Sequence, residues 1–272
     1  TSLDPRVGYE EIELGLKGYF NDRRYMPDPK GSMKARKEIV KLYKDISLKI
    51  DDILITASTS ESYNLIFSSL LKHNDIILLP KPSYPLFEHL ARYSRVRVRY
   101  YDLVIRNGQW RIDIDSIKVD DKRIKAIVLI TPNNPTGMVT HKEDMEAVKK
   151  IVEDKDLYLI IDEVFSSYVY KGEHIYPDTN QNVFILNGIS KSLALPDLKL
   201  AWIGVKGRDK EKMIDKLETA NDTYLNCSYL VQELLPKILR SSVNFRKKWI
   251  EILKENREEL KRFLSKEKNI FG

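Results

Sequence analysis

Short runs of apolar and β-branched residues alternate along the chain with longer segments in which apolar positions recur every three or four residues. The short runs are typical of strands, and a continuous apolar run such as AIVLI indicates a strand buried on both faces of a sheet. The longer segments, such as SESYNLIFSSLLKH and KEDMEAVKKIVEDK, have helical periodicity. Seven strands are predicted, at residues 53–56, 76–80, 96–101, 126–132, 157–164, 183–189 and 200–205.

The order of these segments predicts an α/β fold with a mostly parallel seven-stranded sheet flanked by helices. Most strands are separated by a helical crossover, which joins parallel neighbours. The step from 183–189 to 200–205 is too short for a crossover, so the last strand is predicted to be the one antiparallel strand. We expect an N-terminal segment over 1–30, a large domain over 31–208, and helices over 209–272.

Composition narrows the classes of protein that fit this pattern. A hydrophobic content of 42% in 272 residues allows a large core, and the net charge of +6 is spread over helical segments, which disfavours a nucleic-acid partner. A single cysteine, Cys227, and apolar runs too short to span a bilayer favour a cytoplasmic protein with no membrane partner. No metal site is predicted, because the histidines lack ligand spacing, and we expect them at the surface. They are His73, His89, His141 and His174.

Polar side chains stand at the ends of three successive predicted strands. Asn134 lies in TPNNPTG, Asp162 begins DEVF, and Lys191 ends NGISK. Asn134 and Asp162 are 28 positions apart, and Asp162 and Lys191 are 29 apart, which is close to the length of one βαβ unit. Because ligands bind beyond the carboxyl ends of the strands in such sheets, we expect the three residues on one edge.

An amide, a carboxylate and a lysine on one edge suit a cofactor that carries an aldehyde on a pyridine ring. The lysine can form an imine with the aldehyde, the carboxylate can keep the ring nitrogen protonated, and the amide can donate to the ring phenolate. Taken singly, each residue also fits a turn, a helix cap or an exposed side chain. Their occurrence together in this order favours a functional site.

Residues 20–240 resemble the class I/II aminotransferases, a fold-type I family that depends on pyridoxal 5'-phosphate (PLP). TPNNPTG, DEVF and SKSLALPDLKLAW occur in the family's order and spacing. The resemblance implies that 31–208 is a PLP-binding large domain and that Lys191 is the Schiff-base lysine, which then acts as general base and acid at the substrate Cα. It also implies that Asp162 holds the pyridine nitrogen and that Asn134 donates to the phenolate.

Further cofactor-binding positions match the family one by one. They comprise an aromatic ring against the pyridine, a phosphate-binding turn at a helix start and the serine beside the lysine. In this order they are Tyr84; Ser58, Thr59 and Ser60; and Ser190. Tyr25 matches a tyrosine that reaches the cofactor phosphate of a neighbouring subunit, so the resemblance implies a homodimer. Core packing for Tyr84 and a simple helix cap for the serines stay open as alternatives.

Three positions depart from the family pattern. Lys199 stands where an arginine commonly grips the phosphate, Gly188 where a hydroxyl is usual, and Phe165 where a tyrosine often donates to the phenolate. A lysine is a point charge without the two-pronged contact of arginine. We therefore assign Lys199 to the phosphate and expect weaker phosphate binding and a somewhat raised imine pKa.

The resemblance implies an aminotransferase that moves an amino group from an amino acid to a 2-oxo acid. A PLP-dependent lyase or decarboxylase is the alternative, because it would use the same lysine and aspartate. A non-catalytic PLP-sensing domain is disfavoured, since residues 1–30 contain no winged-helix pattern. The substrate-binding arginine of the family is expected beyond Gly272, so we expect 209–272 to begin an incomplete small C-terminal domain.

Overall fold

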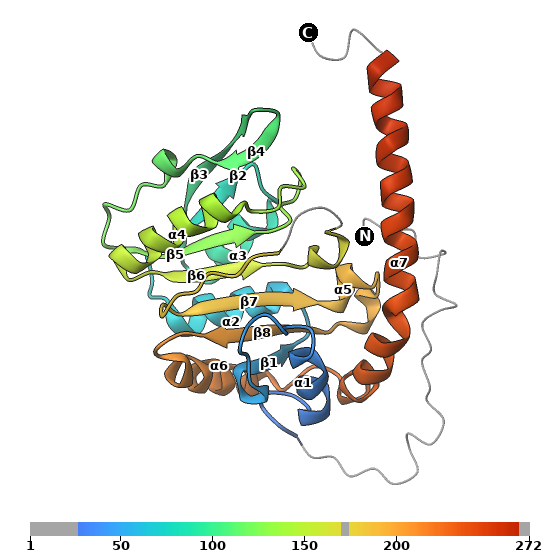
Figure 1. The fold of residues 1–272 in the computed structure, drawn as a ribbon. Coiled ribbons are helices and arrows are strands. Elements are labelled where there is room, and N and C mark those ends of the chain that lie inside the picture. Colours follow the sequence, from blue (N-terminus) through green and yellow to red (C-terminus); the bar gives the residue numbers. More distant parts are fainter. Residues whose placement is uncertain (1–26, 170–173, 267–272) are drawn as a thin grey trace.

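In the computed structural model, which describes residues 27–169 and 174–266, a sheet lies between two layers of helices (Figure 1). Its eight strands have the order β1-β8-β7-β6-β5-β2-β3-β4. The strands are β1 (Ile53–Thr56), β2 (Ile76–Lys81), β3 (Arg97–Arg106), β4 (Gln109–Ile112), β5 (Ile124–Ile130), β6 (Tyr158–Asp162), β7 (Val183–Gly188) and β8 (Ala201–Lys206). The mostly parallel α/β class expected from the apolar runs is confirmed.

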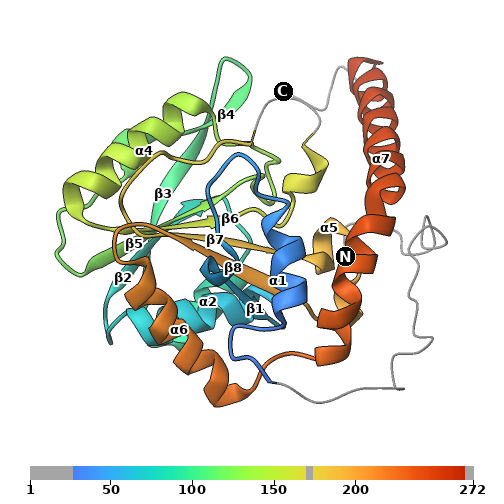
Figure 2. The same ribbon diagram turned by 60° about the horizontal axis from the view of Figure 1, so that its bottom comes forward.

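Helices cover both faces of the sheet (Figure 2). They are α1 (Met33–Val40), α2 (Thr59–Leu70), α3 (Leu86–Tyr93), α4 (Lys142–Lys155), α5 (Ile189–Ser192), α6 (Lys210–Tyr224) and α7 (Tyr229–Lys266). The core on one face includes residues of α2, α3 and α6, and the core on the other face includes residues of α1, α4 and α7. In β6, Ile160 points into the first core and Ile161 into the second. Burial on both faces explains why these strands are continuously apolar.

The strand directions follow the predicted topology, with one addition. β8 is antiparallel to both of its neighbours, β7 and β1, as its short connection predicted. The seven-strand prediction omits β4, which turns back from β3 and pairs with it antiparallel. Asn107 and Gly108 form the turn with φ of 52° and 72°. An Asn-Gly pair with positive φ is a strong hairpin signal, so the sequence contained the information for this strand.

Helix α7 is 38 residues long and extends beyond the rest of the structure (Figure 1). Its first part packs against α1 and buries Leu235, Ile238 and Phe245, whereas Leu260 and Phe263 near its end are exposed. Among the described residues, no helix is long and apolar enough to cross a membrane. The division into domains at residue 208 stays a prediction.

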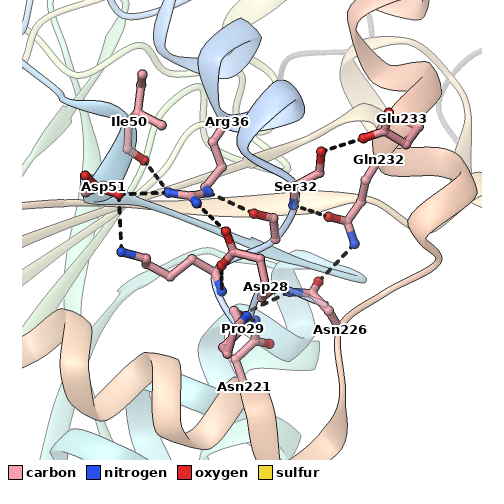
Figure 3. Close-up of polar contacts among 12 residues, drawn as sticks. Asp28, Pro29, Ser32, Arg36, Ile50, Asp51, Asn221, Asn226, Gln232 and Glu233 are labelled. Atoms are coloured by element: carbon pink, nitrogen blue, oxygen red, sulfur yellow. Dashed lines mark hydrogen bonds and ion pairs between the residues drawn. The ribbon is translucent and has the colours of Figure 1, made fainter. Parts of the chain in front are cut away.

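A buried arginine anchors the start of the described chain (Figure 3). Arg36 is 2% exposed. Its guanidinium donates to the carbonyl oxygens of Gly31 (2.9 Å) and Ile50 (3.1 Å) and to the carboxylates of Asp28 (2.6 Å) and Asp51 (3.1 Å). We call these five residues the Arg36 cluster. It ties the segment before α1 to the turn before β1.

Gly31 is required at its place in this cluster. Its φ is +90°, and a Cβ there would lie 2.6 Å from the Cβ of Ile55. Amide side chains of α6 and its following loop complete the anchor, because Asn221 and Asn226 both donate to the carbonyl oxygen of Pro29 (Figure 3). Segments about 200 positions apart in the sequence are thereby joined.

Candidate active site

The carboxyl ends of β1, β2, β5, β6 and β7 lie along one edge of the sheet, which we call the carboxyl edge. Asp162 at the end of β6 is paired with Ile130 of β5 and with Leu186 of β7. Ala201 at the start of β8 is paired with Gly188 of β7 and with Thr56 of β1. Neighbouring strands are roughly 4.8 Å apart, so the segments that follow these strands emerge side by side.

Asp162 is a buried carboxylate, 4% exposed, at the centre of this edge. Its Oδ2 accepts a hydrogen bond from the Tyr63 hydroxyl at 3.0 Å, and its Oδ1 accepts one from the backbone N–H of Val164 at 3.3 Å. Burial raises the pKa of Asp162 to about 6, and the two hydrogen bonds only partly counteract this effect. A cationic N–H donor beside Asp162 would restore the charged form, which is what a protonated pyridine ring offers.

Lys191 lies in α5, three residues beyond the end of β7, and is half-buried. Within the described residues, no hydrogen bond or ion pair of its amine is recorded, so the amine is available to a ligand. Gly188 before α5 lies so close to β8 that an added Cβ would be 2.8 Å from the Cβ of Ala201. A residue with a hydroxyl at position 188 would therefore require a shift of β8, which gives a physical reason for this departure from the family pattern.

The two asparagines of TPNNPTG differ in their surroundings. Asn133 is buried, and its side-chain oxygen accepts a hydrogen bond from the hydroxyl of Thr136 at 2.8 Å. Asn133 therefore stabilises the turn. Asn134 is half-buried, and the described residues include no recorded partner for its amide. The amide that remains open to a ligand is thus the one at position 134.

The start of α2 forms the anion-binding part of the edge. The Ser58 hydroxyl accepts from the backbone N–H of Glu61 at 3.1 Å, so Ser58 is the N-cap of the helix. The N–H groups of Thr59 and Ser60 belong to the first turn and have no acceptor within the helix. Glu61 reaches back to the N–H of Ala57, which places one negative charge beside these groups. The turn can hold a phosphate through backbone N–H groups, whereas the hydroxyl of Ser58 serves the helix.

Tyr84 lies in the loop after β2, at the same edge. Tyr84 is 49% exposed, so the alternative of core packing is wrong. The Tyr84 and Phe87 rings are 6.4 Å apart at 89°, and the Phe87 and Tyr63 rings are 5.1 Å apart at 67°. A row of aromatic rings therefore leads from Tyr84 to the residue that donates to Asp162.

Three predicted residues remain. Ser190 is half-buried in α5, next to Lys191. Lys199 is exposed, has a φ of 48°, and stands two residues before β8 begins at the carboxyl edge. Tyr25 lies outside the described residues. The structure thus brings every described candidate to one edge, although it gives Lys199 a solvent-facing side chain.

Sequence reasoning missed the role of Glu163, which is 1% exposed and directly follows Asp162. Its carboxylate accepts from the hydroxyls of Tyr43 (2.8 Å) and Tyr176 (2.6 Å) and from the amide of Asn187 (2.9 Å). His174 Nε2 lies 2.8 Å from this carboxylate, without the alignment of a hydrogen bond. The His174 side chain is 15% exposed, so the expectation that it lies at the surface is wrong. No local signal identifies these partners, because they come from distant segments.

The Arg36 cluster and the carboxyl edge are not the only polar regions. A shallow hollow of about 490 Å³, lined in part by His73, Arg92, Arg95 and Arg97, lies near the amino ends of β2 and β3. This is the edge opposite to Asp162 and Lys191. This hollow does not include any of the predicted site residues, so the candidate site is identified by its chemistry and by the strand ends.

Comparison with known proteins adds independent information. The profile of the family Aminotransferase class I and II matches residues 4–270. Nicotianamine aminotransferase A of Hordeum vulgare is 34% identical over 227 residues, which cover 78% of this chain and 48% of that protein. An S-alkyl-thiohydroximate lyase of Arabidopsis thaliana is 29% identical over 240 residues, which cover 83% of this chain and 52% of that protein. The chain spans about half the length of these curated relatives.

A solved structure supports the same assignment. The alanine aminotransferase of Pyrococcus furiosus has a TM-score of 0.83 and 28% sequence identity. The match covers 92% of this chain and 66% of that one. The chain therefore belongs to the class I and II aminotransferase family.

Proposed function

We propose that the protein is a PLP-dependent aminotransferase that moves an amino group from an amino acid to a 2-oxo acid, with Lys191 as the residue that links PLP covalently. The observation that carries this proposal is that a buried carboxylate, Asp162, and an amine open to a ligand, Lys191, lie at the same edge of the sheet. PLP, when bound, supplies a pyridine ring that withdraws electrons from the substrate carbon that bears the amino group. The family assignment supports the same chemistry.

Each side chain at the carboxyl edge has a task that suits its surroundings. Asp162 holds the proton on the ring nitrogen, and Tyr63 keeps its carboxylate oriented. Asn134 donates to the phenolate oxygen. With PLP bound, the Lys191 amine would take the proton from the substrate Cα as a general base and, as a general acid, would return it to the cofactor carbon.

The remaining candidates hold the cofactor in place. Tyr84 covers one face of the ring, and Lys199 with the first turn of α2 (Ser58 to Ser60) binds the phosphate. Ser190 lies in the same short helix, α5, as Lys191. The half-buried Phe165 has no hydroxyl to donate, so Asn134 carries the contact with the phenolate alone.

Assembly and location belong to the same proposal. The resemblance predicts a homodimer in which Tyr25 reaches the neighbouring site. It also predicts a PLP-binding large domain over 31–208 and a small domain that begins within 209–272. A cytoplasmic location remains a prediction supported by the single Cys227. Gel filtration of the full chain, with and without the substitution Tyr25→Phe, measures whether the protein is a dimer.

Covalent labelling tests the assignment of Lys191. PLP added to the chain and reduced with borohydride should be found on Lys191 by peptide mass spectrometry. Lys191→Ala should lose the labelled peptide and all half-reaction activity. Lys206→Ala serves as a control, because Lys206 is also half-buried but ends β8 at the opposite edge. Label on another lysine in the unsubstituted chain would defeat the assignment.

A lyase is the second candidate, favoured by the similarity to an S-alkyl-thiohydroximate lyase. The two activities differ in the fate of the amino group. An aminotransferase half-reaction leaves the amino group on the cofactor and releases one equivalent of 2-oxo acid, whereas a lyase regenerates PLP and releases ammonia. A screen of amino acids for 2-oxo acid and ammonia therefore separates the two.

A further inference from the structure

The turn that carries Lys191 is too short to hold its own shape. Helix α5 has four residues, Ile189–Ser192, and helices of this length are unstable without outside contacts. The position of the Lys191 side chain therefore depends on groups that hold α5 at its two ends.

The first end of α5 is held by two hydrogen bonds, one to the segment before β8 and one to the end of β7. The backbone N–H of Ile189 donates to the carbonyl oxygen of Leu200 at 3.0 Å, and the Ser192 hydroxyl donates to the carbonyl oxygen of Gly188 at 2.7 Å. The close packing of Gly188 on Ala201 adds a steric limit. These contacts fix where α5 begins on the sheet.

The C-terminal end of α5 is held by Tyr168, which lies in the connection between β6 and β7. The Tyr168 hydroxyl lies 2.9 Å from the carbonyl oxygen of Lys191 and 3.0 Å from that of Ser192. A hydroxyl has a single proton, so this donor is shared between the two carbonyl groups. The last carbonyl groups of a helix have no N–H donor within the helix. Tyr168 supplies a donor to two of them, and the Lys191 carbonyl oxygen also accepts from the backbone N–H of Ala194 at 3.4 Å.

Tyr168 also connects Lys191 to the strand that ends in Asp162. It closes the short 3₁₀ turn Ser166–Tyr168, which begins four residues after Asp162, and α7 packs against this turn. A movement of the α5 backbone away from this turn would lengthen the shared hydrogen bond. Tyr168 therefore limits the position of the Lys191 backbone relative to the end of β6.

We infer that Tyr168 is a positioning residue that sets the placement of Lys191 relative to Asp162, through two backbone carbonyl groups and without contact to the cofactor. The inference rests on the proposed function of Lys191. It assigns to Tyr168 a task that neither the motifs nor the family match indicates.

The test compares two substitutions of the same kind. Tyr168→Phe removes the shared hydrogen bond, and Tyr101→Phe is the control, because the buried Tyr101 hydroxyl donates to the carbonyl oxygen of Val128 at 2.7 Å, away from α5. The first readout is amide hydrogen exchange of the full chain before PLP is added. Leu193 and Ala194 donate to carbonyl oxygens of α5, so Tyr168→Phe should speed their exchange about tenfold.

The second readout is the rate at which PLP becomes linked to Lys191, a condensation of amine and aldehyde that releases one water. This rate should fall about tenfold in Tyr168→Phe and stay within twofold in Tyr101→Phe. Unchanged exchange and an unchanged rate in Tyr168→Phe would overturn the inference while Lys191 keeps its proposed function. If PLP were found on another lysine, the proposed function would fail, and the exchange of α5 amides would still decide whether Tyr168 holds this turn.

Discussion

The Arg36 cluster and the carboxyl edge are both rich in buried polar groups, and they differ in how far those groups are satisfied. Arg36 makes four hydrogen bonds within the protein, two of them to carboxylates (Figure 3). At the carboxyl edge, Asp162 is buried with no cation recorded beside it in the described chain, and burial raises its pKa to about 6. Satisfied buried groups stabilise a fold, whereas a buried carboxylate with a raised pKa at the end of a strand is a candidate site for a ligand.

The difference has an energetic basis. A buried charge costs free energy unless a partner offsets it, and at the Arg36 cluster the partners are part of the chain. At the carboxyl edge, the described residues supply no cation to Asp162, so a cationic ligand that binds there recovers part of the cost.

The largest effect is expected in the Arg36 cluster. Arg36→Ala removes one donor each from the carboxylates of Asp28 and Asp51 and from two carbonyl groups, so the free energy of unfolding should fall by about 3–5 kcal/mol. Arg99→Ala is the matched control, because Arg99 pairs with Asp121 at 2.8 Å but is 44% exposed and should lose less than about 1 kcal/mol. Urea denaturation of both variants measures the difference, and equal losses would contradict it.

The next effect concerns Asp162 and depends on pH. With a folded pKa of about 6 and an ordinary value near 4, Asp162 loses its proton in the unfolded chain first as the pH rises. The free-energy cost of burying the charged carboxylate is therefore absent below pH 4 and complete above pH 6. Relative to the unsubstituted chain, Asp162→Asn should gain about 2–3 kcal/mol of stability between pH 4 and pH 7 without PLP. Parallel pH profiles of unfolding would show that Asp162 carries no such cost.

A smaller effect is expected at Tyr63. Its hydroxyl lowers the pKa of Asp162, so Tyr63→Phe should raise this pKa further. The loss of stability should still begin near pH 4, the ordinary pKa, but should extend to higher pH. The free energy of unfolding at pH 7 should fall by about 1–2 kcal/mol, since a hydrogen bond to a charged group is lost. Tyr101→Phe, which loses a bond to an uncharged carbonyl group, should be destabilised without this change in pH dependence.

The smallest effect is expected at Lys199. Lys199→Arg offers the phosphate two parallel donors and should tighten PLP by about 1 kcal/mol or roughly fivefold. Fluorescence titration with PLP measures this affinity. Since Lys199 is exposed, an unchanged dissociation constant would mean that its side chain points away from the phosphate.

Most of the fold was predictable from local patterns. Apolar runs located seven of the eight strands, and the short step before β8 predicted its direction. The hairpin to β4 was also encoded locally, in Asn107 and Gly108. The spacing of Asn134, Asp162 and Lys191 predicted a shared edge, because each lies near the carboxyl end of a parallel strand and the strands are joined by crossovers of similar length.

By itself, the sequence determined which residue types stand at the ends of the strands, and it pointed to the family. Only the tertiary structure decided which neighbours they meet. Tyr63 and Asp162 are 99 positions apart, and Tyr43 and Glu163 are 120 apart. Periodicity depends on contacts within a few residues, whereas burial and hydrogen bonding depend on how distant segments pack. For this reason the pKa of Asp162, the network of Glu163 and the hold of Tyr168 on the Lys191 turn appear only in the folded chain.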